Sequence, residues 1–191
     1  MKKTKNKPRP NIILAVVGLP GAGKTEAVKY LIKKTNWSRI YFGQKTFDEI
    51  KKRKLKINEK NERKIREGLR KKYGMAAMAI INLPEVRKLS KKSNVIIESL
   101  YSWEEYLEIK KDFKIFKALA IFASPEVRIK RLRKRKQRAI TLAEMESRDY
   151  SQIENLHQAG PIARADFTIV NNGSKKDFYK EIDKIVIKLQ K

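Results

Sequence analysis

The chain has 191 residues, enough for one domain with a buried core but cramped for two. It contains no cysteine and a single histidine, which excludes disulfides and thiolate metal sites and argues strongly against a histidine-based metal site. The formal net charge of +26 at pH 7 would attract polyanions, so it is compatible with a nucleic-acid partner and equally with a solvated, lysine-rich surface.

Apolar strands and helical segments alternate along the chain after a basic tail at residues 1–10. Residues 12–17 form a continuous aliphatic run, which is typical of a buried parallel strand. In chain order, the strands are expected at residues 12–17, 39–42, 94–98, 116–122 and 167–170. The helices are expected at residues 25–34, 45–54, 58–72, 75–83, 103–110, 142–157 and 175–189. One further helix is expected to begin at residue 125 and to run into an arginine-rich segment. Pro84 is expected to end the helix that begins at residue 75.

Strands that alternate with helices predict a three-layer α/β fold, in which a five-stranded parallel sheet carries helices on both faces. We expect residues 11–191 to form this single domain. No stretch approaches the roughly 20 apolar residues of a membrane span, so the sequence favours a cytoplasmic protein without membrane contact.

The segment GLPGAGKT, residues 18–25, matches the phosphate-loop pattern at every fixed position. It lies between the first strand and the first helix, where glycines let backbone N–H groups turn towards an anion and the helix N-terminus adds its positive end. Lys24 is expected to neutralise the β and γ phosphates, and the Thr25 hydroxyl to hold Mg²⁺. The expected ligand is therefore ATP with Mg²⁺, bound by Gly18, Leu19, Pro20, Gly21, Ala22, Gly23, Lys24, Thr25 and Glu26.

Two further groups of side chains are candidates for catalysis. Glu98 ends the third strand in IIESLYS, where it could serve Mg²⁺ beside Thr25 or simply mark the point at which the strand leaves the core. Arginines follow the fourth strand, and phosphoryl transfer needs cations over the moving charge. We expect Arg131, Arg135 and Arg138 to act in this way, although a solvated basic face is the alternative.

The sequence resembles the nucleoside monophosphate kinase group, in particular the proteins of archaea that are related to dephospho-CoA kinase and adenylate kinase. The likeness is carried by GLPGAGKTEAVKYL, YFG, LRKKYGMAAMA, VIIES, ASPEVRIKRLRKR, ESRD and ADFTIVNNGS, in the order of the family. It implies that Asn171, Gly173 and Ser174 lie beside the donor adenine. It also implies a helical acceptor-binding flap at residues 43–83 and an arginine-rich lid at about residues 135–145.

Two departures from the family pattern bear on the acceptor. Gln44 stands where the family commonly has aspartate after glycine, and Tyr101 stands where an arginine is expected. The first removes a carboxylate that could accept a hydroxyl proton, and the second removes a cation from the transferring phosphate.

Two functions follow from the sequence. The first is a kinase that transfers phosphate from ATP to a small nucleotide-like acceptor, a nucleoside monophosphate or dephospho-CoA. The second is a nucleotide-binding ATPase or regulatory module without that activity, associated with nucleic acid through its basic surface.

Overall fold

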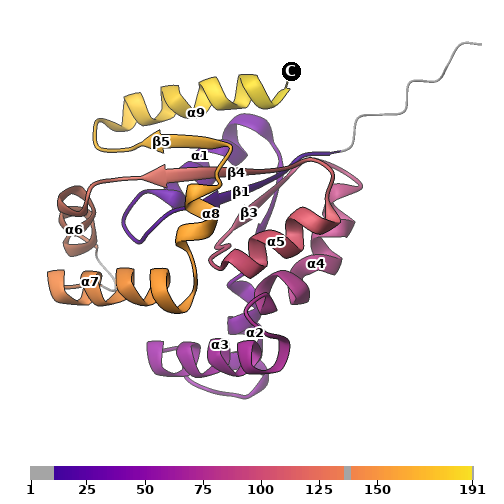
Figure 1. Cartoon of the computed structure of the whole chain (residues 1–191), viewed down its shortest axis with the longest axis vertical. Coiled ribbons are helices and arrows are strands. Elements are labelled where there is room, and N and C mark those ends of the chain that lie inside the picture. Colours follow the sequence, from indigo (N-terminus) through magenta and orange to yellow (C-terminus); the bar gives the residue numbers. More distant parts are fainter. Residues whose placement is uncertain (1–10, 136–138, 191) are drawn as a thin grey trace, which may run out of the picture.

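The five strands form one parallel sheet in the order β2-β3-β1-β4-β5 (Figure 1). The computed structural model describes residues 11–135 and 139–190, so the tail at residues 1–10 and Arg138 lie outside the described residues. The strands are β1 (Ile13–Val17), β2 (Ser38–Tyr41), β3 (Val95–Glu98), β4 (Phe116–Phe122) and β5 (Phe167–Val170). All residues of β1 are buried, because this strand is central and covered on both faces. The predicted fold class is confirmed.

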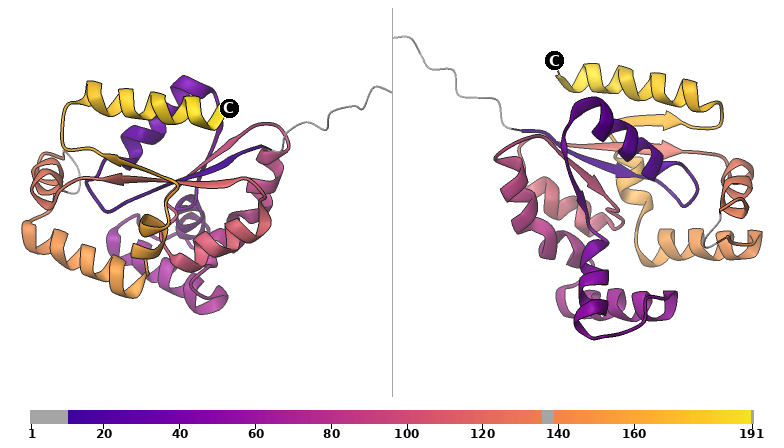
Figure 2. Two further views of the ribbon diagram at one scale, coloured as in Figure 1. Left: turned by 45° about the horizontal axis from the view of Figure 1, so that its top comes forward. Right: turned by 180° about the vertical axis from the view of Figure 1, so that it is seen from behind.

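Helices cover both faces of the sheet (Figure 2). Successive residues of β1 point to opposite faces: Leu14 and Val16 pack in one apolar cluster, and Ile13, Ala15 and Val17 pack in the other. The first cluster is completed by helices α1 (Lys24–Thr35) and α9 (Lys175–Gln190), and the second by α4 (Ala77–Ser90), α5 (Trp103–Asp112) and α8 (Ala159–Ala163).

Two helical units lie beyond the carboxyl ends of the strands, where α/β proteins of this kind place their ligands (Figure 1). The first is the flap, made of α2 (Gln44–Lys52) and α3 (Glu59–Tyr73). The second comprises α6 (Pro125–Arg133), α7 (Leu142–Tyr150) and the following π-helical turn η1 (Ser151–Asn155). A small apolar cluster of Ile129, Leu132, Ile140 and Met145 joins α6 to α7. The limits of flap and lid drawn from the sequence stay predictions.

Helix α4 continues through Pro84, so the expected end of the helix at this residue is wrong. Proline removes one helical N–H, which leaves the carbonyl of Ile80 without its partner, and both residues lie on the exposed side of the helix. Leu83 and Val86 are buried on the other side, and we attribute the continuation to their packing against the sheet.

The helix expected over residues 142–157 is also interrupted. Regular α7 ends at Tyr150, η1 follows, and His157 takes a left-handed backbone conformation with φ 52° before the short α8. Among the helices of the described ranges, none is long and apolar enough to cross a membrane.

Candidate active site

The glycine loop is shaped by both backbone conformation and space. Gly18 and Gly23 have φ values of 137° and 112°, which only glycine adopts readily. A Cβ atom on Gly18 would lie 2.2 Å from the Ile121 carbonyl oxygen, and one on Gly23 would lie 2.4 Å from the Asn171 amide nitrogen. Within the described part of the chain, no side chain caps the first turn of α1, so its N–H groups remain available to an anion.

Lys24 folds back over this loop. Its Nζ donates to the carbonyl oxygens of Gly18 at 2.6 Å and Leu19 at 3.0 Å. Burial, followed by the charges of Arg135 and Arg128, lowers the pKa of Lys24 to about 8. An ammonium group held in a desolvated place among other cations is stabilised by a bound anion, which is what a phosphate would supply.

Thr25 and Glu98, the two residues that the sequence offers for Mg²⁺, meet at the edge of the loop. The Thr25 hydroxyl donates to Glu98 Oε1 at 3.1 Å, and the carboxylate is nearly fully buried. Hydroxyl and carboxylate oxygens suit Mg²⁺, which takes its remaining ligands from water and phosphate. In residues 11–135 and 139–190 there is no group of three or more acidic or histidine side chains that could hold a metal without such help.

Glu98 has a second partner that sequence reasoning missed. Arg39, from β2, donates through Nε to Glu98 Oε2 at 2.7 Å and forms an ion pair with the same oxygen. Strands β2 and β3 pair directly, with Tyr41 opposite Glu98, which places Arg39 two residues before the same sheet edge. The carboxylate is therefore held between a hydroxyl and a guanidinium group.

Arg128 and Arg131 bind the loop from α6. The side chain of Arg128 is buried, and it donates to the carbonyl oxygens of Pro20 and Ala123, both at 3.2 Å. Its guanidinium also forms two bonds to Asp149 of α7, at 2.9 and 2.6 Å. Arg131 lies within 3.4 Å of the Ala22 carbonyl oxygen and of Asn171 Oδ1.

The residues expected beside an adenine have different surroundings in the structure. Asn171 lies against the loop and donates to the Ala22 carbonyl at 2.8 Å. Gly173 is exposed, and Ser174 caps α9 by accepting from the Asp177 N–H at 3.2 Å. Glu26 turns towards α9 as well, where Lys175 and the Tyr179 hydroxyl donate to it and lower its pKa.

A cleft of about 730 Å³ lies between the flap and α7 with η1. Its floor includes Tyr41, which ends β2, together with Gly43 and Tyr101, which follow the carboxyl ends of β2 and β3. Its walls include residues of α3 on one side and of α7 and η1 on the other: Glu59, Glu62, Arg63, Arg66, Glu67 and Arg70, and Ser147, Arg148, Ser151, Gln152 and Asn155.

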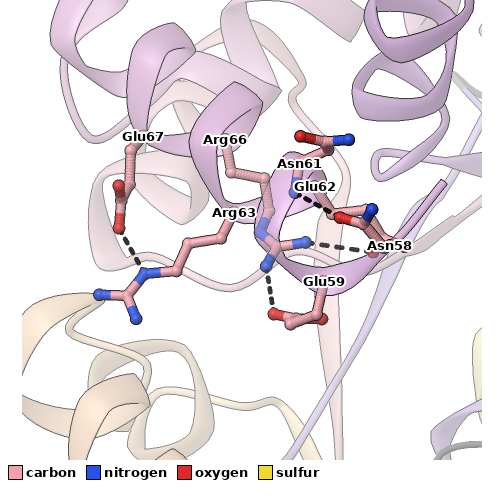
Figure 3. Close-up of polar contacts among 7 residues, drawn as sticks. All are labelled: Asn58, Glu59, Asn61, Glu62, Arg63, Arg66 and Glu67. Atoms are coloured by element: carbon pink, nitrogen blue, oxygen red, sulfur yellow. Dashed lines mark hydrogen bonds and ion pairs between the residues drawn. The ribbon is translucent and has the colours of Figure 1, made fainter. Parts of the chain in front are cut away.

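The arginines of the cleft fall into two groups. Arg63 pairs with Glu67 at 2.7 Å and Arg66 pairs with Glu59 at 2.9 Å, all on α3 (Figure 3). Arg70, by contrast, has a buried Nε without a hydrogen-bond partner among the described residues, and burial lowers its pKa. The Arg148 side chain likewise forms neither a hydrogen bond nor an ion pair with any described residue.

Other unsatisfied polar atoms line the same cleft. The Thr46 hydroxyl and Gln152 Oε1 are buried, and neither atom has a hydrogen-bond partner in the part of the chain that is described. Buried polar groups are rarely left in this state, because each costs about 1–3 kcal/mol. A polar ligand in the cleft would satisfy them.

The loop that carries Tyr101 is fixed by a buried acid from α5. Glu105 Oε2 accepts from the N–H groups of Tyr101 at 2.8 Å and Ser102 at 3.3 Å. Burial raises the pKa of Glu105 to about 7. Sequence reasoning missed this residue, although the Ser102-x-x-Glu105 spacing is that of a capping box.

The phosphate loop, the sheet order and the two helical units at the carboxyl edge define a P-loop kinase-like fold. A family model described as "AAA domain" matches residues 14–154. The UPF0200 protein of Thermococcus kodakarensis is 31% identical over 180 residues, which cover 92% of this chain and 96% of that protein. The chain therefore belongs to the AAA domain family of P-loop proteins and, more narrowly, to the UPF0200 family.

Other comparisons extend this result. The UPF0200/UPF0201 protein of Archaeoglobus fulgidus is 31% identical over 183 residues, but the match spans 94% of this chain and only 56% of that longer protein. Shikimate kinase from Bacteroides thetaiotaomicron superimposes with a TM-score of 0.60 at 16% identity, covering 94% of this chain and 99% of that one. Shikimate kinase from Aquifex aeolicus gives a TM-score of 0.54 at 19% identity, covering 94% and 96%. At these identities the two kinases share the fold.

Proposed function

We propose that this protein transfers the γ-phosphoryl group of ATP from the glycine loop to a small nucleotide-like acceptor in the cleft. The observation that carries the proposal is the ammonium group of Lys24 folded over the glycine loop, where the carbonyl oxygens of Gly18 and Leu19 are its hydrogen-bond acceptors among the described residues. The charge of Arg135 adds to burial in lowering the pKa of Lys24, and Arg148 of the cleft wall adds to burial in lowering the pKa of Arg135. A cation that is close to both sites can stabilise charge that moves from one to the other.

In this proposal the donor half follows the phosphate loop. Lys24 and the loop N–H groups bind the β and γ phosphates, and Asn171, Gly173 and Ser174 lie beside the adenine. Thr25 and Glu98 would hold Mg²⁺, which neutralises phosphate charge when bound. Arg131 and Arg135, with Arg138 outside the described residues, stabilise the transferring group.

In the acceptor half, the unpaired cations would bind an anionic group. Arg70 and Arg148 face the cleft from α3 and α7 and have no carboxylate partner in the described ranges, whereas Arg63 and Arg66 are already neutralised. An acceptor phosphate would bridge the two helices and draw the flap towards α7. The resemblance to nucleotide kinases supports a nucleoside monophosphate or dephospho-CoA in this place.

The choice between these acceptors turns on the missing base. Gln44 is exposed and donates to Asp48 at 3.1 Å, and neither residue is among those that line the cleft, so the carboxylate of Asp48 does not replace the family aspartate there. A hydroxyl acceptor such as dephospho-CoA needs a base to take its proton, but a phosphate oxygen is already deprotonated. We therefore rank a nucleoside monophosphate above dephospho-CoA.

ATP hydrolysis is the second candidate, and the floor of the cleft motivates it. Tyr101, in place of a family arginine, supplies no positive charge there. The loss of one charge-stabilising donor costs about 10²–10³ in rate, which would leave water as the effective acceptor.

A screen of labelled ATP against nucleoside monophosphates, nucleosides, dephospho-CoA and shikimate, with a no-acceptor control, tests both candidates. We expect labelled product with a nucleoside monophosphate and a loss of about 10²-fold or more in Lys24→Ala. Lys29→Ala, which changes an exposed lysine of the same helix, is the matched control. Free phosphate release that no acceptor changes would support the ATPase, and full activity in Lys24→Ala would contradict the mechanism.

A further inference from the structure

The flap carries a large excess of positive charge. Residues 44–73 contain 13 lysines and arginines but only 5 acidic residues. We define the flap lysine surface by seven exposed side chains: Lys51, Lys52, Lys54, Lys56, Lys60, Lys64 and Lys71.

Helix α3 separates its charges by face. Arg63, Arg66 and Arg70 line the cleft. Lys60, Lys64 and Lys71 are spaced by four and seven residues, so they share a different face of the helix. Glu59 and Glu67 pair with Arg66 and Arg63, and Glu67, three residues after Lys64 and four before Lys71, lies at the border of the lysine face.

The lysines of this surface contrast with those of α9. None of the seven forms an ion pair with a described residue. On α9, Lys180 pairs with Asp177 at 3.9 Å and Lys184 pairs with Glu181 at 2.6 Å. The flap lysine surface therefore carries more uncompensated charge than α9.

Backbone hydrogen bonds hold the connection between α2 and α3 in a defined shape. The N–H of Leu55 donates to the Ile50 carbonyl at 3.0 Å, and the Asn61 side chain donates to the Lys56 carbonyl at 2.7 Å. Lys54 takes a left-handed conformation with φ 55°, which turns the chain sharply. The lysines are thus presented by an ordered turn, which lowers the entropy lost on binding.

The pattern fits a phosphodiester backbone better than a lipid surface. A helix that lies on a membrane needs an apolar face beside its lysines. Ile65 and Leu69 of α3 instead pack towards the interior, and the exposed large apolar side chains of the flap are Leu55 and Ile57 of the connection and Tyr73 at the end of α3. Spaced lysines without an apolar stripe match the repeated charges of a nucleic acid.

We propose that the flap lysine surface binds the phosphate backbone of a nucleic acid. Each lysine contacts phosphate oxygens as a point charge, so the binding carries little sequence preference. None of the seven lysines is among the residues that line the cleft, so the nucleic acid binds without ATP and leaves the cleft open.

The test is a titration of the full chain, without ATP, against labelled single-stranded DNA, single-stranded RNA and duplex DNA at several salt concentrations. The variant K51Q/K52Q/K54Q/K56Q removes four charges from the surface, and K176Q/K180Q/K184Q/K188Q removes four from α9 as the matched control. We expect the flap variant to bind at least about tenfold more weakly and to lose about 2–3 units of the salt slope for single strands, because each released phosphate contact contributes about 0.7.

The control variant should retain most of the affinity and slope. Equal losses in both variants would overturn the proposal, since binding would then follow the net charge alone. Undiminished binding by the flap variant would also overturn the proposal, because it would assign the binding to another region such as residues 1–10. Binding to vesicles that contain phosphatidylserine, without binding to any oligonucleotide, would also overturn it. Lys24→Ala should bind nucleic acid normally, which separates this result from the proposed kinase activity.

Discussion

The ion pair between Arg128 and Asp149 should be among the largest single contributions to the stability of the active site. Arg128 is 3% exposed, and its guanidinium makes two bonds to the carboxylate, whose side chain is 16% exposed. The substitution Arg128→Met keeps much of the side-chain volume but leaves the Asp149 carboxylate without its counter-ion. Breaking a buried pair in this way costs about 3–5 kcal/mol, and the partial exposure of Asp149 places the expected loss near the lower end, at about 3 kcal/mol.

Urea unfolding at pH 7.5 measures this loss, provided that the slope with denaturant is unchanged. The double variant Arg128→Met/Asp149→Leu leaves neither charge, so it should be less destabilised than the sum of the single variants. A loss below about 1 kcal/mol in Arg128→Met, or strict additivity in the double variant, would refute the reasoning. Because Arg128 also donates to Pro20, nucleotide affinity should fall in the same variant.

Three further predictions concern single residues. The pKa of Lys24 is about 8 without an anion, and bound phosphate should raise it. ATP binding should therefore take up protons near pH 8 and weaken at higher pH. Calorimetry in buffers of different ionisation enthalpy measures this proton uptake. Glu105 has a folded-state pKa of about 7, above its usual 4.5, so the free energy of unfolding should fall by about 3 kcal/mol as the pH rises from about 4.5 to 7 and above. The variant Glu105→Gln should abolish this fall. A wild-type free energy of unfolding that does not change over this pH range would contradict the prediction. Gly23→Ala should lower nucleotide affinity and stability because its Cβ has no room, whereas Gly68→Ala, in an open position of α3, should stabilise by about 0.5–1 kcal/mol in the same unfolding assay.

The sheet and the glycine loop could be predicted from the sequence because their sequence patterns are local. The run at residues 13–17 is apolar throughout, as a central parallel strand must be, and the glycines of the loop occupy conformations that other residues avoid. Pro84 shows the limit of local reasoning. A proline usually ends a helix, but here we attribute the continuation of the helix to the packing of Leu83 and Val86.

The ion pairs that build the site could not be predicted, because their partners are distant in sequence. Helical spacing places Arg128 on the same side of its helix as Arg131 and Arg135, but it gives no sign of a carboxylate partner. The structure instead pairs Arg128 with Asp149, 21 residues later on another helix. Arg39 and Glu98 are separated by 59 residues and meet only because β2 and β3 are neighbours.

The distribution of these pairs explains why the site needs an anion at its centre. Arg128 has a carboxylate partner, and so does Arg39, so each holds structure without requiring a ligand. Lys24 has only carbonyl oxygens as hydrogen-bond acceptors within the described residues, and Arg135 and Arg148 have no carboxylate within ion-pair distance there. The charge of Arg135 adds to burial in lowering the pKa of Lys24, with Glu98 and Asp149 acting in the opposite direction, and the charge of Arg148 adds to burial in lowering the pKa of Arg135. A polyphosphate bound among these cations would replace this repulsion by attraction, which favours a ligand that extends from the loop towards the cleft.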